Sequence, residues 1–305
     1  MEDFELTLFD RIEVIKNTVQ QYGEENFYVS FSGGKDSTVL HYLIDMALPN
    51  NKIPRVFINT GIEYLDIVKF TKDLASKDER FVILEPTQPI KKILDKYGYP
   101  FKSKQHSHYL SIYQHSRGGK SVDRYLGNIE STTMFRCPKS LEYQFTEDFK
   151  IKVSEQCCNK LKKDRVKEYE KVNNKSIAIL GLMQNEGGQR ASHSGCVVFD
   201  TKDTSKLVKF KPLNPITKEF EEWFIEKYNI QLCKLYYPPY NFRRTGCKGC
   251  PYSLDLQEQL QIMEKYLPNE RKQCEIIWKP IYEEYRRIGY RLEKYEQIKL
   301  FELEE

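Results

Sequence analysis

The sequence lacks the features that would place a protein in a membrane or outside the cell. No apolar run approaches the length of about 18 residues that spans a bilayer. The first residues, MEDFELTLFDRIE, are acidic and amphipathic, whereas a signal peptide is basic and then apolar. We therefore expect a cytoplasmic protein with no membrane partner. Internal repeats and low-complexity segments are also missing, which excludes solenoid architectures.

A strong charge of either sign is missing as well. The chain of 305 residues has a formal net charge of only +4, with 40% hydrophobic and 30% charged residues, as in ordinary globular proteins. This balance suits acidic small substrates, while 21 tyrosines and a lysine cluster at 160–163 leave nucleic acid open as a further partner. Eight cysteines in a cytoplasmic chain indicate metal ligands or buried thiols and not a disulfide framework.

A glycine turn between a strand and a helix is the most informative segment. A β-rich run at 27–31 ends in SGGKDS, residues 32–37, and an apolar helical pattern follows at once. Glycines let successive backbone N–H groups face an anion, and the start of a helix adds partial positive charge. Lys35 adds a mobile cation, and Ser32 and Ser37 add hydroxyls. We expect bound phosphate or sulfate, although the GxxxxGK[ST] spacing of γ-phosphate NTPases is absent.

The rest of the first half alternates strands with helices. An amphipathic helix at 4–22 precedes the glycine turn. A second strand with its turn is expected at 55–61, and a third strand at 81–84. Such alternation predicts an α/β fold, with a Rossmann-like parallel sheet flanked by helices. Ligands of these sheets bind at the carboxyl ends of the strands, so the turns at 32–37 and 59–63 should share one crevice.

The later segments are less regular. Residues 97–150, rich in Gly, Ser, His, Lys and Tyr, are interpreted as an insertion or lid. The histidines of this insertion, expected on a loop that touches phosphate or nucleic acid, are His106, His108 and His115. A basic helix at 154–171 and a strand at 176–182 follow. We expect two domains, a nucleotide-binding α/β domain at 1–235 and a helical, cysteine-bearing extension at 236–305.

Four motifs occur in one order over most of the chain. They are SGGKDS at 32–37, NTGIEY at 59–64, NEGGQR at 185–190 and TGCKGC at 245–250. In this combination they resemble the phosphoadenylyl and adenylyl sulfate (PAPS) reductase family of PP-loop adenine-nucleotide enzymes. The resemblance implies the fold of the adenine nucleotide alpha hydrolases and an adenylyl nucleotide, ATP or adenylyl sulfate, as ligand. It also implies chemistry at the α-phosphate or at the sulfate.

The resemblance implies a set of site residues. Lys35, Asp36 and Arg190 are the expected catalytic residues: Lys35 stabilises the charge of the reacting phosphate, Asp36 binds Mg²⁺ through water, and Arg190 neutralises the anion. Glu186 is expected to orient the anion or the loop. The pair Arg243–Arg244 is read as a phosphate contact, a cluster contact or a plain surface position. The residues expected to bind the nucleotide are Ser32, Gly33, Gly34, Lys35, Asp36, Ser37, Asn59, Thr60, Gly61, Glu63, Glu186 and Arg190.

The cysteines extend the resemblance to a metal centre. Adenylyl sulfate reductases that this chain resembles hold a 4Fe-4S cluster with a CC pair and a distant CxxC. The corresponding ligands here are Cys157, Cys158, Cys247 and Cys250. A four-cysteine Zn²⁺ site is the alternative, although neighbouring thiols with diverging side chains suit a tetrahedral ion poorly. Cys137 or Cys196 stands as a substitute for one member of the pair, and Cys233 and Cys274 are interpreted as buried thiols.

One feature of the reductases is missing from the chain. Their C-terminal ECGxH tail carries a nucleophilic cysteine, whereas this sequence ends in EKYEQIKLFELEE. The sequence therefore favours an enzyme that binds ATP or another adenylyl nucleotide and uses the cluster in sulfur transfer, as a homo-oligomer with a sulfur or electron donor protein as partner. Two alternatives stay open. One is a sulfonucleotide reductase with another nucleophile such as Cys196, and the other is a nucleotide-sensing or nucleic-acid-associated component of a DNA-modification or defence system.

Overall fold

The protein is described from a computed structural model. The structure describes residues 3–130, 135–184 and 195–294. The chain forms two packing units, one made of residues 1–59, 63–85 and 165–246 and the other of residues 60–62, 86–164 and 247–305. The expected domain boundary at residue 235 stays a prediction about folding, because packing alone does not show which segments fold independently.

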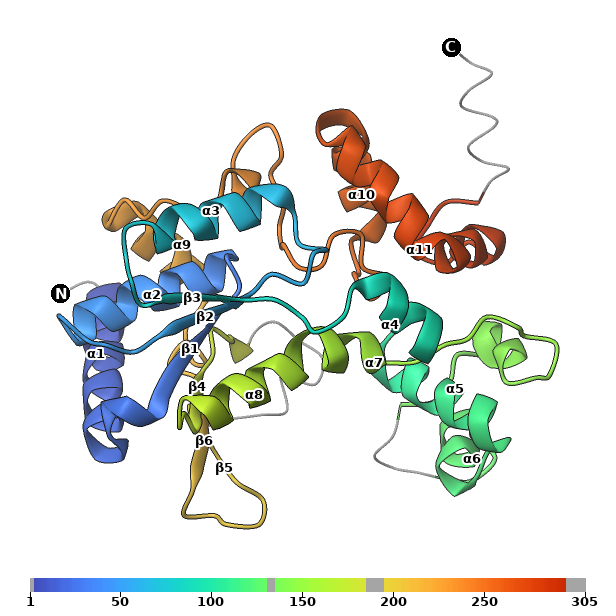
Figure 1. Ribbon diagram of the computed structural model, residues 1–305, viewed down its shortest axis with the longest axis horizontal. Coiled ribbons are helices and arrows are strands. Elements are labelled where there is room, and N and C mark those ends of the chain that lie inside the picture. The colour runs from blue at the N-terminus through green and yellow to red at the C-terminus, as the bar shows by residue number, and fades with distance from the viewer. Residues whose placement is uncertain (1–2, 131–134, 185–194, 295–305) are drawn as a thin grey trace. The chain divides into compact units, whose positions relative to one another are not determined.

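A six-stranded sheet forms the centre of the first unit (Figure 1). Its strands are β1 (Phe27–Phe31), β2 (Arg55–Ile58), β3 (Phe81–Leu84), β4 (Ile177–Ile179), β5 (Val197–Phe199) and β6 (Leu207–Phe210). They lie in the order β3-β2-β1-β4-β6-β5, and every pairing is parallel except that of β5 with β6. The predicted Rossmann-like parallel sheet is therefore confirmed. The strand order reverses beside β1, which makes the junction of β1 and β4 the switch point of the fold.

Both faces of the sheet are covered, which explains why its central strands are mostly apolar. The helices of this unit are α1 (Asp3–Tyr22), α2 (Lys35–Ala47), α3 (Leu65–Ala75), α8 (Asp164–Val172) and α9 (Lys218–Lys227), with 3-10 turns at Glu24–Asn26 and Lys234–Tyr236. Residues of α1, α2 and α9 form one core with β1 and β4, centred on Ile15, Leu40 and Phe224. On the other face, Tyr169 of α8 packs against Tyr28 of β1. Figure 1 shows α2 and α8 on opposite sides of the sheet.

The strands β5 and β6 were not expected from the sequence. Each has only three or four residues, and β5 leaves Val197 39% and Phe199 38% exposed at the edge of the sheet. A strand this short and half-exposed has little of the hydrophobic patterning that identifies longer strands. The antiparallel β5 covers the edge of β6.

The second unit is helical. Its helices are α4 (Ile90–Tyr97), α5 (Lys104–Ser116), α6 (Lys120–Leu126), α7 (Gln156–Cys158), α10 (Leu256–Tyr266) and α11 (Pro268–Ile288), with a 3-10 turn at Lys139–Gln144 and a π-helical turn at Asn159–Lys163. The interpretation of residues 97–150 as irregular is thus wrong, since two α-helices and a 3-10 turn lie within it. None of the described helices combines the length and the apolar composition needed to cross a membrane.

The expected histidine loop is part of a helix with a buried core. His106 lies on α5 with no exposed surface, and its ring nitrogens pair with the Tyr125 hydroxyl at 2.9 Å and with Oε1 of Gln144 at 2.7 Å. Burial lowers the pKa of His106 to about 4, so this imidazole is a neutral packing group. The prediction of a phosphate-contacting loop is wrong here because aromatic packing, which the polar sequence hides, supports a helix.

Candidate functional site

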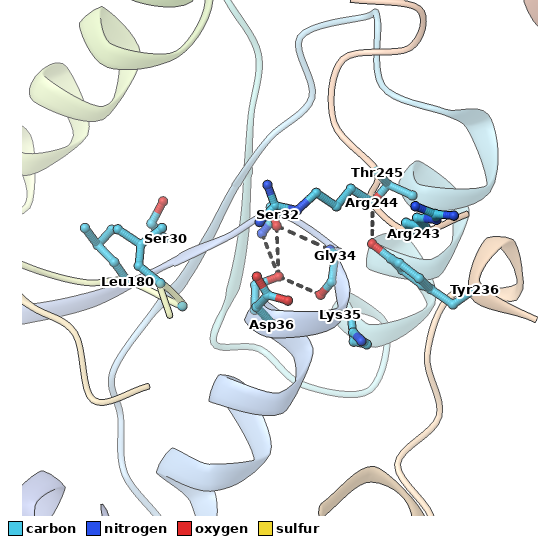
Figure 2. A pocket seen from close by; sticks show the side chains of 13 residues that line it. Ser30, Ser32, Gly34, Lys35, Asp36, Leu180, Tyr236, Arg243, Arg244 and Thr245 are labelled. Atoms are coloured by element: carbon cyan, nitrogen blue, oxygen red, sulfur yellow. Dashed lines mark hydrogen bonds between the residues drawn. The ribbon is translucent and has the colours of Figure 1, made fainter. Parts of the chain in front are cut away.

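The SGGKDS turn is held in shape by its own hydroxyls. The Ser37 hydroxyl donates to the carbonyl of Gly34 at 3.0 Å and accepts from the Ser32 amide at 3.2 Å (Figure 2). Gly33 has a φ of +71°, and a Cβ there would lie 2.8 Å from Cγ2 of Ile67 on α3. Both the left-handed backbone and the contact with α3 require glycine at this position. The turn therefore presents the first turn of α2 as a rigid anion-binding element.

A cavity of about 300 Å³ opens at the switch point of the sheet. Three segments of the first unit line it: residues 30–37 at the end of β1, residues 180–182 at the end of β4, and Tyr236 with the segment 243–245. The lining includes Ser32, Gly34, Lys35, Asp36 and Ser37. This is the place where open parallel sheets bind ligands, and its volume is at the lower end for small-molecule sites.

The end of β4 touches the start of α2 through backbone. A Cβ on Gly181 would lie 3.0 Å from the carbonyl oxygen of Asp36. The φ of Gly181 is not in the left-handed range, so the close approach alone explains the glycine. This contact sets how near the two walls of the cavity come to each other.

A segment from the C-terminal part of the first unit forms the opposite wall. The Tyr236 hydroxyl and Oγ1 of Thr245 are hydrogen-bonded at 2.6 Å, and burial raises the pKa of Tyr236 to about 12. Figure 2 shows Tyr236 and Arg243 on the side of the loop opposite to Leu180, and Arg244 extended toward Ser32. Three roles were considered for the pair Arg243–Arg244: a phosphate contact, a cluster contact or a plain surface position. Both arginines lie in the cavity lining, which agrees with the first of these roles. Tyr236, Thr245 and Gly181 were missed as lining residues. Thr245 belongs to the TGCKGC motif, which was read only as a source of metal ligands, and Tyr236 and Gly181 lie outside the motifs.

A buried carboxylate on α9 pairs with the lysine of the turn. Oε2 of Glu221 lies 3.0 Å from Nζ of Lys35, and the Glu221 side chain has no exposed surface. Neither Glu221 oxygen makes a hydrogen bond of good geometry, so the contact is an ion pair without a directed bond. Burial, the largest cause, and the Asp36 charge together raise the pKa of Glu221 to about 7, against the lowering effect of the Lys35 charge. Nothing in the sequence distinguishes this residue from the other polar positions of its helix.

The other predicted nucleotide residues are distributed less simply. Asn59 directly follows β2 and donates its backbone N–H to Leu84 at 2.8 Å, and Glu63 is buried in the same unit. Thr60 and Gly61 pack with the second unit. Within the described ranges, the cavity lining includes none of these four residues, so their role as nucleotide contacts stays a prediction. The predicted residues Glu186 and Arg190 lie outside the described residues.

The four predicted metal ligands all belong to the second unit. Sγ of Cys157 lies 4.0 Å from Sγ of Cys158. A hydrogen bond to Cys158, burial, and the charges of Cys158, Cys250 and Cys247 all raise the pKa of Cys157, so the four thiols are electrostatic neighbours. We expected the side chains of the neighbouring cysteines to diverge, but they do not. Their sulfur separation of 4.0 Å is close to the value of about 3.8 Å in a tetrahedral site with 2.3 Å bonds.

The CxxC loop is held by one face of α11. The Trp278 indole N–H donates to the carbonyl of Lys248 at 3.1 Å, the Tyr282 hydroxyl donates to that of Gly249, and the Tyr285 hydroxyl donates to that of Pro251 at 2.9 Å. The loop amide of Lys248 donates to the carbonyl of Ile62 at 2.7 Å. These bonds fix the backbone around Cys247 and Cys250 independently of any bound metal.

Positive charge surrounds the cysteine pair. The hydrogen bond from Cys157 lowers the pKa of Cys158, and the charges of Lys104, Lys162 and Lys163 add to this effect. A thiolate is the form that binds metals. Across residues 3–130, 135–184 and 195–294, no three His, Cys, Asp or Glu side chains are grouped closely enough for a single metal ion.

The remaining cysteines lie apart from this group. Cys196, in the first unit, accepts a hydrogen bond from Arg11 at 3.2 Å, and Cys137 is buried beside Lys102, which influences its pKa. Cys233 and Cys274 are buried, as expected. Cys274 nevertheless packs on the CxxC loop, since its Sγ would lie 2.7 Å from a Cβ on Gly249.

Comparison with known proteins yields a family match and more distant likenesses. Residues 26–125 match the model of the phosphoadenosine phosphosulfate reductase domain. An uncharacterized protein of Methanocaldococcus jannaschii is 30% identical over 112 residues, covering 33% of this chain and 27% of that protein. The chain thus matches only about a quarter of that relative's length.

Two solved structures illustrate the structural likenesses. The phosphoadenylyl-sulfate reductase of Candida auris, a phosphate complex, aligns with a TM-score of 0.44 and 11% identity over 77% of this chain and 93% of that one. The NH3-dependent NAD synthetase of Campylobacter jejuni, in complex with nitrate, aligns with a TM-score of 0.42 and 14% identity over 95% and 97%. The match to residues 26–125 confirms the resemblance to the phosphoadenosine phosphosulfate reductase domain for the part of the chain that holds the SGGKDS and NTGIEY motifs.

Proposed function

We propose that this protein is an enzyme that binds ATP or another adenylyl nucleotide in the cavity beside residues 32–37 and takes part in sulfur transfer with a 4Fe-4S cluster. The observation that carries the proposal is the cavity at the switch point. It combines the glycine turn and the start of α2 with the side chains of Lys35 and Arg244. Such a combination favours a bound phosphate over a neutral ligand.

The arrangement suits chemistry at an inner phosphate. In a reaction of this type an acceptor oxygen bonds to the α-phosphorus of ATP, the bond to the β-phosphate oxygen breaks, and pyrophosphate leaves. Negative charge builds on the phosphate oxygens as this happens, and the positive charges of Lys35 and Arg244, both in the cavity lining, would offset it. Asp36, whose carboxylate shares the cavity, would hold Mg²⁺ through water.

The chemistry of the thiols in the second unit supports the cluster part of the proposal. Cys157, Cys158, Cys247 and Cys250 offer four soft donors that are electrostatic neighbours, with lysines close by to favour thiolates. When bound, the cluster would supply electron transfer or a site for sulfur. The protein's own contribution is the loop that α11 holds in place by hydrogen bonds to three of its carbonyls.

Calorimetry with α,β-methylene-ATP tests the nucleotide site. We expect Arg244→Ala to weaken binding about ten- to hundredfold, the value of a charge-assisted contact of about 1.5 to 3 kcal/mol. Lys69→Ala, which removes an exposed lysine from α3, is the matched control and should leave affinity unchanged. Equal affinities for Arg244→Ala and the wild type, or a preference for GTP, would contradict the proposed site.

Anaerobic purification tests the cysteine site. We expect a brown protein with about four irons per chain, and loss of the colour in Cys247→Ser and Cys250→Ser. A colourless protein with one zinc would contradict the cluster and indicate a structural site. Pyrophosphate release supports the sulfur-transfer reaction, whereas thioredoxin-dependent reduction of adenylyl sulfate would point to a reductase. If the protein shows neither activity and copurifies with an assembly, a nucleotide-sensing component would be favoured.

A further inference from the structure

Glu221 is a buried acid that forms an ion pair with Lys35, a residue of the cavity lining. Its carboxylate has no exposed surface and lies 3.0 Å from Nζ of Lys35. On its own helix the neighbours Phe220 and Phe224 are buried and apolar, and Phe4 of α1 packs against Phe220. The charged groups that act on the carboxylate come from α2 and are Lys35 and Asp36. The charge of Glu221 therefore depends on where Lys35 is.

Lys35 has two competing anionic partners once a nucleotide is present. It is the first residue of α2, its side chain is 24% exposed, and it lines the cavity. In Figure 2 its side chain turns away from Ser32 and Arg244, which face the cavity from the other side. A phosphate in the glycine turn offers Lys35 a stronger anion than one carboxylate.

We infer that Lys35 leaves Glu221 for the phosphate when a nucleotide binds, and that Glu221 then takes up one proton, so that nucleotide binding is coupled to proton uptake. The inference rests on the proposed nucleotide site. The proton uptake is caused by the free-energy cost of an unpaired charge in an apolar interior, since a carboxylate that takes up a proton becomes neutral and avoids this cost. The negative charge of Asp36 and of the phosphate favours the neutral form further.

The direction of the pH dependence follows from linkage. In the free protein the pKa of Glu221 is already raised to about 7, and losing Lys35 raises it more. Below about pH 7 the acid is protonated before binding, so affinity does not depend on its titration. Above that pH each bound nucleotide takes up a proton, and affinity falls about tenfold per pH unit until the pKa of the bound state is reached.

Calorimetry in buffers of different ionisation enthalpy measures the protons directly. The probe is α,β-methylene-ATP with excess Mg²⁺ at about pH 8, where the nucleotide itself is deprotonated. We expect uptake of close to one proton by the wild type and by Glu222→Gln, an exposed neighbour on the same helix. Glu221→Gln should bind without this uptake and, with Lys35 released, about tenfold more tightly than the wild type.

The outcomes separate this inference from the proposed function. Nucleotide binding with the same proton uptake in Glu221→Gln and the wild type would overturn the coupling alone. Proton-neutral binding by the wild type would also overturn it, even if the variant failed to fold. Absence of binding by any adenine nucleotide would overturn the proposed function and the coupling together.

Discussion

The cavity beside residues 32–37 and the cysteine loop are built in opposite ways. At the cavity, Gly33, Gly34 and Gly181 let chain segments approach one another closely, and the start of α2 supplies backbone amides. The cysteine loop is a set of side-chain donors whose backbone is held from outside, by Trp278 and Tyr282 of α11. The first site is thus sensitive to added volume, and the second to the loss of its supporting hydrogen bonds.

The difference also shows in how each site is encoded. The glycine turn lies within one stretch of six residues, so its geometry is local. The four thiols come from positions about 90 residues apart, and the helix that holds their loop begins 18 residues after Cys250, at Pro268. A local motif defines the first site, whereas the second depends on tertiary packing.

The largest effect should come from adding volume to the cavity. In Gly34→Val the new Cβ would lie 3.2 Å from both Oγ of Ser32 and the hydroxyl of Tyr236, and its methyl groups would project into the space for phosphate. We expect nucleotide binding to disappear in calorimetry while far-ultraviolet circular dichroism stays that of the wild type, since the φ of Gly34 is −79° and suits any residue. Retained affinity would show that the phosphate binds elsewhere.

The two glycines beside the CxxC cysteines form a matched pair. Gly249 has a φ of +59°, and a Cβ there would lie 2.7 Å from Sγ of Cys274, whereas a Cβ on Gly246 meets nothing within 4 Å. Gly249→Ala should lower the free energy of unfolding by about 3 kcal/mol and reduce the metal content. Gly246→Ala should stay within about 0.5 kcal/mol of the wild type. Equal urea midpoints for the two variants would contradict the packing of this loop.

The buried acid of the first unit predicts a pH-dependent stability. The pKa of Glu221 in the folded protein, about 7, lies above the usual value of 4.5 for a glutamate. The stability that its protonated form contributes is therefore complete below about pH 4.5 and is lost as the pH rises through 7. Across this window Glu221→Gln should gain about 3 kcal/mol in unfolding free energy relative to the wild type. Urea unfolding at several pH values checks this. Parallel curves for Glu221→Gln, Glu222→Gln and the wild type would mean that the acid is solvated.

The smallest effect should come from removing one bond of the cysteine loop. Tyr282→Phe leaves the buried carbonyl of Gly249 without its donor, and we expect a loss of about 1 to 3 kcal/mol in unfolding free energy. Tyr228→Phe, at a tyrosine that is 38% exposed, is the control and should be neutral. If Tyr282→Phe is as stable as the control but still loses metal, α11 positions the cysteines without stabilising the fold.

The sequence predicted what is local and missed what is long-range. The strand before SGGKDS, the helix after it and the parallel sheet followed from periodicity and turn chemistry. Helix α5 was missed because its polar sequence is supported by packing around His106. Glu221 was missed for a similar reason, because only the fold brings α9 against Lys35. The four cysteines were chosen through a family resemblance, and the lysines near Cys158 became visible only in the structure.

The contact at Gly181 has a practical consequence for the size of the cavity. There the two walls meet through backbone atoms, with the φ of Gly181 outside the range that only glycine adopts. Because glycine has no side chain, Gly181 allows the closest approach of β4 to the start of α2. Replacing it with alanine and then serine would separate β4 from α2 in graded steps. The size of ligand that the cavity accepts would change, while every charged group of the cavity would stay the same.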